Sequence, residues 1–177
     1  RKGNSDKFIW KHNDVDHLEH LLKNADKNHP KIVAFESVYS MDGDFAPIEK
    51  ILEVSKKYNA LTYLDEVHGV GLYGKNGGGL SEQLGLTSEI DIIEGTLAKG
   101  FGLMGGYITA KYNIIDVIRS FAPGFIFTTS LPPSLAAAAV ASIRYVKNNY
   151  SLREALYDRA NKLKKLMLAK NLPIIKN

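Results

Sequence analysis

Three short apolar segments, each followed at once by polar residues, limit most strongly how this chain can fold. Residues 31–35, 60–64 and 90–94 have the length and the β-branched and aromatic content of strands. Residues 47–58, with helical apolar spacing, separate the first two, and this strand–helix–strand order favours parallel pairing. We therefore predict an α/β fold: a three-layer, mostly parallel sheet with helices on both faces.

The other segments extend this pattern along the chain. Apolar periodicity and turn residues predict a helix from about residue 15, and further helices over 80–84, 113–120, 134–148 and 151–170. Further strands are expected over 8–10, 106–110 and 125–127. No repeat or linker interrupts the chain before residue 171, so we expect one domain over residues 1–170.

Composition excludes several classes of function. The 177 residues are 45% hydrophobic and 24% charged, which are ordinary values for a globular domain. The chain has no cysteine, which excludes disulfides and thiolate metal sites. Its net charge of +4 is modest and no apolar run has the length of a membrane span. We therefore expect no nucleic acid and no membrane as partner, whereas a small anionic ligand is compatible with the charge.

Four chemically useful side chains follow the predicted strands. Ser40 follows the first strand, Asp65 and His68 follow the second, and Lys99 follows the third. Ligands of open α/β sheets bind at the carboxyl ends of the parallel strands. The sequence therefore predicts that a hydroxyl, a carboxylate, an imidazole and an amine converge at one edge of the sheet.

Lys99 lies among Gly100, Gly102, Gly105 and Gly106, where the backbone can approach a ligand closely. A lysine amine acts as a catalytic nucleophile when it forms a Schiff base, typically with pyridoxal phosphate. That cofactor needs a carboxylate at its pyridine nitrogen. A solvated loop lysine is the alternative interpretation of the same position.

The same residue types also occur in metal sites and in hydrolases. Asp65 and His68, three positions apart, could form half of a metal site, but no second histidine cluster supports it, and we expect no metal. Ser40, Asp65 and His68 also occur in the order of an α/β-hydrolase triad. Ser40 lacks the glycine-flanked turn that exposes a nucleophilic serine, which disfavours a hydrolase.

The segment from Gly69 to Gly74 formally matches a dinucleotide-binding fingerprint. The glycine-rich sequence continues to Gly79 and does not open a helix where the fingerprint requires one. We interpret this segment as a loop.

Three motifs together resemble the α-oxoamine synthases, pyridoxal-phosphate enzymes with the aspartate-aminotransferase fold. The motifs are Phe35-Glu36-Ser37-Val38-Tyr39-Ser40-Met41-Asp42-Gly43, Leu64-Asp65-Glu66-Val67-His68 and Gly95-Thr96-Leu97-Ala98-Lys99. Within this family, the sequence most resembles the members that make 5-aminolevulinate, on the segments 12–14, 71–74 and 125–133. The resemblance covers essentially the whole chain.

The resemblance implies how pyridoxal 5'-phosphate would be held. Lys99 would bond covalently to the cofactor and later move the glycine α-proton. Asp65 would pair with the pyridinium nitrogen. His68 would hydrogen-bond the phenolic oxygen, with Ser40 beside it, and Thr96 would bind the phosphate.

The resemblance also implies contacts to a second subunit and to the acyl-CoA substrate. Thr128 and Thr129 correspond to phosphate contacts made across a homodimer interface. Lys7 corresponds to a position that touches the acyl-CoA substrate. Residues 1–170 would be the later part of the large cofactor-binding domain, and residues 171–177 would begin the connection to a small C-terminal domain.

The reaction implied is the condensation of glycine with succinyl-CoA to give 5-aminolevulinate, CoA and carbon dioxide, the first step of tetrapyrrole biosynthesis. Two alternatives stay open: a sister activity, 8-amino-7-oxononanoate synthase or 2-amino-3-ketobutyrate CoA ligase, and a non-catalytic chain that keeps only the fold. We expect this chain by itself to have weak or no activity. A bacterial protein would be cytoplasmic, and a eukaryotic one would lie in the mitochondrial matrix.

Overall fold

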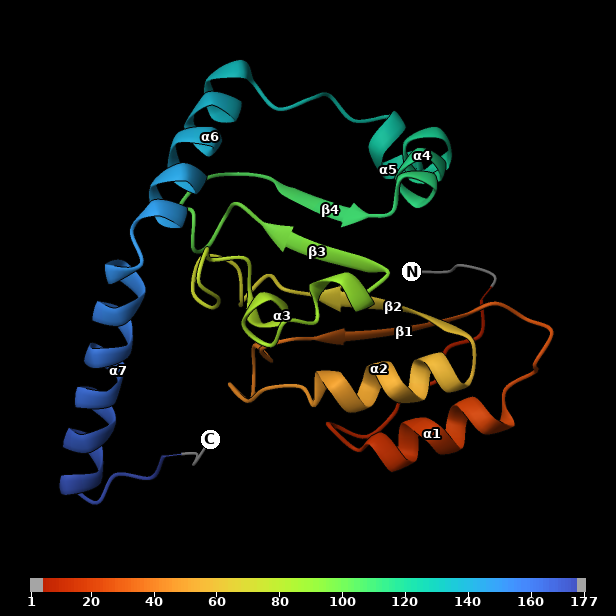
Figure 1. Cartoon of the computed structure of the whole chain (residues 1–177), viewed down its shortest axis with the longest axis horizontal. Helices are drawn as coiled ribbons and strands as arrows, with labels where there is room; N and C mark the ends of the chain where they lie inside the picture. The colour runs from red at the N-terminus through yellow and green to blue at the C-terminus, as the bar shows by residue number, and fades with distance from the viewer. Residues whose placement is uncertain (1–4, 175–177) are drawn as a thin grey trace.

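The computed structural model describes residues 5–174 and is built on one four-stranded sheet. The strands are β1 (Lys31–Glu36), β2 (Ala60–Asp65), β3 (Ile92–Thr96) and β4 (Gly106–Ala110), in this spatial order. β1, β2 and β3 are parallel, and β4 runs antiparallel to β3 (Figure 1). The mixed α/β class with a mostly parallel sheet is therefore confirmed.

Helices connect and flank these strands. They are α1 (Val15–Asn24), α2 (Ile48–Lys57), α3 (Leu80–Gln83), the 3-10 turn η1 (Thr87–Glu89), α4 (Tyr112–Phe121), α5 (Pro123–Ile126), α6 (Pro133–Asn148) and α7 (Ser151–Ala169). α6 and α7 stand beside the carboxyl ends of β1–β3, whereas α4 and α5 lie near the opposite ends (Figure 1). Within residues 5–174, no helix combines the length and the apolar character needed to cross a membrane.

α1 shows how the sequence sets these elements locally. The Asp14 carboxylate accepts a 2.9 Å hydrogen bond from the His17 N–H, which caps an otherwise free donor of the first turn. One turn apart, Leu18 and Leu22 lie on the same side of the helix and are buried. The helix therefore begins where its cap is and packs along one apolar stripe.

The core lies on one face of the sheet. Val33 and Phe35 of β1 and Leu64 of β2 are at most 5% exposed and pack with apolar side chains of α1, α2 and α3. On the other face, Ile32 is 62% exposed and Leu61 is 41% exposed. Of the two helical layers predicted, the described residues therefore cover one face of β1 and β2; we call the other face the open face.

Two expected strands are absent from the described residues. Residues 8–10 form no strand, although Trp10 packs against the core. Residues 125–127 fall in and after α5, because Pro123 occupies the first helical position, where its fixed φ favours a helical turn. Three apolar residues form too short a run to distinguish a strand from a helical turn.

The third strand begins two residues later than predicted. Asp91 precedes it, and its carboxylate accepts hydrogen bonds from the Thr62 N–H at 2.8 Å and the Thr62 hydroxyl at 3.0 Å. Asp91 therefore ties the start of β3 to β2 through its side chain, and regular pairing starts at Ile92.

Candidate active site

The last residues of β1 and β2 and the middle residue of β3 place three carboxylates side by side. Glu36 pairs in register with Asp65, and Asp65 pairs in register with Glu94. Because partners in register point to the same face of a sheet, these side chains form a row on the open face. We call Glu36, Asp65 and Glu94 the carboxylate row. A cavity of about 430 Å³ lies against Glu36, Tyr63 and Asp65.

Lys99 and His68 meet beside this row. The Lys99 Nζ lies 2.8 Å from the His68 Nε2. The other ring nitrogen, Nδ1, lies 3.6 Å from a Glu36 carboxylate oxygen. Lys99 is exposed and His68 is partly buried, so the amine is accessible while the imidazole is held from two sides. The predicted convergence of Lys99 and His68 is thus present.

Asp65 and Ser40 are anchored through backbone N–H groups. The Asp65 carboxylate accepts a 2.8 Å hydrogen bond from the Val67 N–H, which orients it at the end of β2. The backbone N–H of Ser40 donates to Glu36 at 3.0 Å, so the turn after β1 and the carboxylate row are connected. The ring nitrogens of His68 face Lys99 and Glu36, an arrangement unlike a Ser40-containing hydrolase triad.

Thr96 stabilises the loop that carries Lys99. Its hydroxyl donates to the Gly105 carbonyl at 3.2 Å and accepts from the Ala98 N–H at 3.1 Å. The backbone N–H of Leu97 also donates to the Gly105 carbonyl at 2.9 Å. The loop is therefore closed at its base, and Lys99 is exposed two residues after Leu97.

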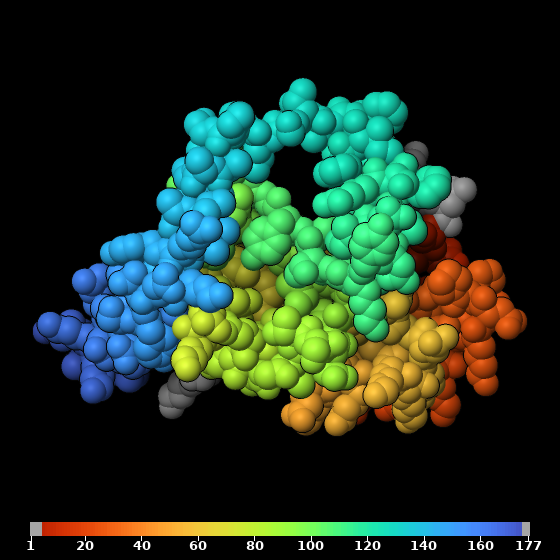
Figure 2. Space-filling view, turned by 45° about the horizontal axis from the view of Figure 1, so that its top comes forward, coloured from red at the N-terminus to blue at the C-terminus, as the bar shows by residue number. Residues whose placement is uncertain are grey.

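Two predicted site residues, Thr128 and Thr129, lie outside the group around Lys99. Thr128 and Thr129 are exposed in the segment between α5 and α6, and no contact joins them to Lys99 within residues 5–174. This segment arches away from the body and leaves an opening beneath it (Figure 2). Lys7 is exposed in the stretch before α1.

Glu66, which the motif analysis did not single out, is the most enclosed acid near the site. It is 0% exposed. Its carboxylate accepts hydrogen bonds from the Ser37 hydroxyl at 2.6 Å, the Ser81 N–H at 2.7 Å and the Leu80 N–H at 3.1 Å. Strand alternation, which points Glu66 away from the face of Asp65, is the sequence signal that indicates its burial.

The glycine-rich loop between β2 and α3 is fastened at several points. The Tyr157 hydroxyl donates to the Leu72 carbonyl at 2.9 Å, and Arg153 donates to the Lys75 carbonyl at 2.6 Å. The helix that follows, α3, has four residues and begins only at Leu80. The loop interpretation is confirmed, and the long helix required by a dinucleotide fingerprint is absent here.

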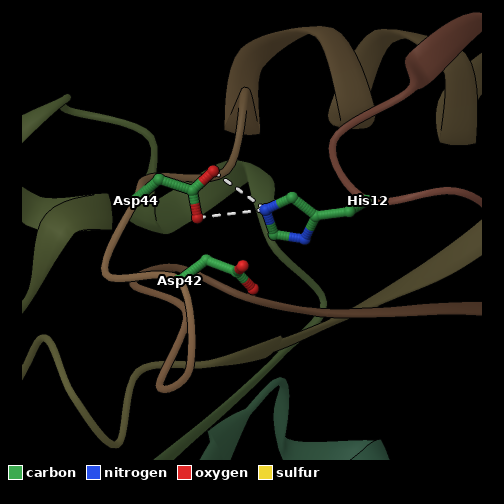
Figure 3. A group of neighbouring side chains, drawn as sticks. All are labelled: His12, Asp42 and Asp44. Atoms are coloured by element: carbon green, nitrogen blue, oxygen red, sulfur yellow. Dashed lines mark hydrogen bonds and ion pairs between the residues drawn. The ribbon is translucent and has the colours of Figure 1, made fainter. Parts of the chain in front are cut away.

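A second cluster lies near the turn after β1 (Figure 3). Ligand-type atoms of His12, Asp42 and Asp44 lie within 4.8 Å of one another. Asp44 already accepts from the His12 Nε2 at 2.8 Å and the Asn13 amide at 2.9 Å. These contacts hold residues 12 and 13 against the turn that carries Asp44. Burial, with the charges of Asp44 and Glu36, raises the pKa of nearby Tyr39 to about 12.

The sequence of this chain is similar to those of known enzymes. A 5-aminolevulinate synthase of Rickettsia prowazekii is 54% identical over 177 residues, which are 100% of this chain and 43% of the relative. A 5-aminolevulinate synthase of Bradyrhizobium diazoefficiens is 52% identical over 99% of the chain and 43% of its own length. The chain thus spans less than half the length of these curated relatives.

Solved structures give the same fold. A serine palmitoyltransferase variant from S. paucimobilis with a bound PLP–myriocin aldimine has a TM-score of 0.86 and 37% identity, over 90% of this chain and 42% of that one. The Sphingomonas wittichii serine palmitoyltransferase has a TM-score of 0.86 and 34% identity, over 90% and 40% of the two chains. The sequence matches the aminotransferase class I and II family over residues 6–177, and the chain belongs to this family.

Proposed function

We propose that the protein is a pyridoxal-phosphate-dependent acyltransferase that condenses glycine with succinyl-CoA to give 5-aminolevulinate, CoA and carbon dioxide. The observation that carries this proposal is the accessible Lys99 amine against His68, beside Asp65 on the open face. The 52% and 54% identical relatives described above, both named 5-aminolevulinate synthase, support the choice of reaction.

The donor set fits pyridoxal phosphate. Lys99 supplies an exposed amine, and Asp65 supplies a carboxylate next to an open cavity. Gly71 and Gly100 leave the loop backbones in close contact: a Cβ on Gly100 would lie 2.6 Å from the Val70 carbonyl oxygen. Because these two loops are closely packed, the backbone that carries Lys99 is held in place. A lysine that bonds a cofactor has to be held in this way, so that the cofactor is correctly oriented.

The chain's own residues then have distinct tasks. Lys99 holds the cofactor covalently and moves the proton at the glycine α-carbon. Asp65 would pair with the pyridinium nitrogen, and His68 would hydrogen-bond the ring's phenolic oxygen, with Ser40 beside it. Thr96 contributes to the phosphate site at the base of the loop. When bound, the cofactor withdraws electrons from the substrate α-carbon, which makes that carbon nucleophilic toward a thioester.

We also propose that the protein acts as a homodimer, with Thr128 and Thr129 reaching the cofactor phosphate of the second subunit. Phe125 of α5 is 56% exposed, and Phe127, at the start of the arched segment, is 87% exposed. Large apolar side chains gathered on one exposed segment are typical of a surface that another chain covers. Lys7 is proposed to contact the acyl-CoA.

The position of the chain within the larger protein is part of the proposal. Residues 1–170 form the later part of the cofactor-binding large domain, and residues 171–177 begin the connection to the small domain. Residues 175–177 lie outside the described structure. The relatives named above are bacterial, and we propose a cytoplasmic location.

Reduction with borohydride after addition of pyridoxal phosphate tests the cofactor assignment, because it fixes the label on the lysine that bonds the cofactor. Peptide mapping should place the label on Lys99, and the Lys99→Arg variant should lose it. The Lys57→Arg variant is a matched control, since Lys57 is an exposed lysine paired with Glu19. Labelling at another lysine, or none, contradicts the proposal.

A panel of acyl-CoA substrates tests the reaction. Glycine with succinyl-CoA should give the highest turnover in the complete protein. Preference for another acyl-CoA or for another amino acid would favour a sister synthase. Absence of turnover with all of them, together with an unlabelled Lys99, would favour a chain that keeps the fold without chemistry.

A further inference from the structure

We propose that Glu36 is a positioning residue that holds His68 in one tautomer, so that the imidazole takes the proton that Lys99 must lose before its nitrogen bonds to a carbonyl carbon. The geometry of three side chains carries this inference. The consequence for Lys99 rests on the proposed function, whereas the tautomer of His68 does not.

The Lys99 contact defines one side of the imidazole. A lysine ammonium has three N–H donors and no acceptor. Across the 2.8 Å contact, the His68 Nε2 must therefore accept, and a neutral ring then carries its proton on Nδ1. The opposite tautomer would place a ring N–H against the ammonium.

Glu36 defines the other side. Its carboxylate oxygen lies 3.6 Å from the His68 Nδ1, which is too long for a hydrogen bond but within the range of an ion pair. The carboxylate therefore acts through its charge, which favours a proton on the nearer ring nitrogen. The same carboxylate oxygen accepts the Ser40 N–H at 3.0 Å, and this bond fixes the position of the charge.

The proton step is balanced within these three residues. An N–H bond of the Lys99 ammonium breaks, and an N–H bond forms at the His68 Nε2. The lysine nitrogen keeps its electron pair and becomes the free amine that attacks a carbonyl carbon. The positive charge moves to the imidazole, where the Glu36 carboxylate is the nearest negative group seen among residues 5–174.

The first test reads the His68 tautomer without any cofactor. The ¹⁵N chemical shifts of histidine-labelled protein distinguish a protonated from an unprotonated ring nitrogen, and the His68→Gln variant identifies the signal. We expect an unprotonated Nε2 in the native protein and a mixture of tautomers in Glu36→Gln, whose amide oxygen can still accept the Ser40 N–H. Glu36→Asp should restore the native tautomer.

A second carboxylate–histidine pair, Asp26 and His29, provides a matched control. Asp26 lies 3.0 Å from His29 on the surface, and Asp26→Asn should leave the His68 signal unchanged. An unchanged His68 tautomer in folded Glu36→Gln would overturn the inference. Glu36→Ala serves as the second variant if Glu36→Gln does not fold: it too should give a mixture of tautomers, and an unchanged His68 tautomer there would also overturn the inference.

The second test measures the rate at which pyridoxal phosphate attaches to Lys99, trapped by borohydride at different pH values. Glu36→Gln should slow attachment at neutral pH by at least about tenfold, within the range of acid–base effects. At alkaline pH the Glu36→Gln variant should regain the native rate, because hydroxide in the solvent then removes the proton from the Lys99 ammonium. If the native protein is not labelled at Lys99, the proposed function fails while the tautomer result stands; equal rates at neutral pH overturn the role of Glu36.

Discussion

The two ends of the sheet differ in how far this chain satisfies its own groups. At the carboxyl ends of β1 and β2, a fully buried carboxylate, Glu66, accepts three hydrogen bonds from within the chain. At the other end, the arched segment after α5 exposes Phe127 almost completely. Contacts within this chain therefore hold the residues around the carboxylate row in place, whereas the arched segment exposes an apolar surface that we propose another subunit covers.

The largest difference in stability between the two regions is expected when one phenylalanine in each is replaced by alanine. Phe35 is 5% exposed in the core, and Phe35→Ala should lower the free energy of unfolding by about 3–5 kcal/mol, through lost burial and a cavity. Phe127 is 87% exposed, and Phe127→Ala should leave the stability of the single chain nearly unchanged. Denaturant unfolding at low protein concentration measures both.

The same pair tests the assembly. Sedimentation of the complete protein should show a weaker dimer for Phe127→Ala, because an apolar contact at the arch is removed. A native dimer affinity in this variant would contradict the proposed interface.

The next largest effect on stability is expected for the buried carboxylate of Glu66. Glu66→Ala removes the acceptor of three donors and leaves them buried without partners, which should destabilise the fold by about 3 kcal/mol or more. Glu94 is the control, because it lies in the middle of the neighbouring strand β3 and its carboxylate accepts a single hydrogen bond seen among residues 5–174, from the Tyr63 hydroxyl at 2.6 Å. Glu94→Gln should change the unfolding midpoint much less. Equal effects would show that the loop does not depend on Glu66.

These residues also show what the sequence could and could not predict. β1 and β2 were predicted within one residue at each end, because apolar alternation and flanking turns are local signals. The α5 turn was missed, since a three-residue apolar run carries no clear period. The convergence of His68 and Lys99 followed from the rule for strand ends, whereas the 3.6 Å approach of Glu36 depends on side-chain orientations that no spacing encodes.

A glycine in each region offers a smaller and more local comparison. A Cβ at Gly100 would lie 2.6 Å from the Val70 carbonyl oxygen, a backbone atom that can move only with its loop. Gly100→Ala should therefore destabilise the fold by about 1–3 kcal/mol and weaken cofactor attachment at the adjacent Lys99. At Gly124 in α5, nothing lies within 4 Å of the added atom.

Gly124→Ala is accordingly the control and should be neutral or slightly stabilising, since alanine is the better helix former. Thermal unfolding and borohydride trapping measure the two effects together. If Gly100→Ala behaves as Gly124→Ala does, the loops at Lys99 are less rigid than their contact implies.

The smallest effect concerns acid sensitivity of the glycine-rich loop. Partial burial acts to raise the pKa of Glu82, but hydrogen bonds from the Gly78 N–H and from Asn76 outweigh it, and the net pKa lies below 4.5. A carboxyl whose pKa is lowered by folding stabilises the fold above its unfolded pKa, and this contribution is lost as the pH falls through the folded value. Stability should therefore decline below about pH 4.5 in the native chain, and part of that decline should be absent from Glu82→Gln.

Unfolding midpoints measured from pH 7 to pH 3 would show this as a shallower slope for Glu82→Gln. Because the side chain is only partly buried, solvent screens the interaction and the change of slope should be small. A control comes from the distant surface pair: the pKa of Asp26 is also lowered, chiefly by the Asn28 N–H. Asp26→Asn should likewise flatten the slope but leave limited proteolysis of the glycine-rich loop unchanged. Glu82→Gln should speed cleavage of the loop at neutral pH, because it weakens the contacts of Glu82 with Asn76 and Gly78.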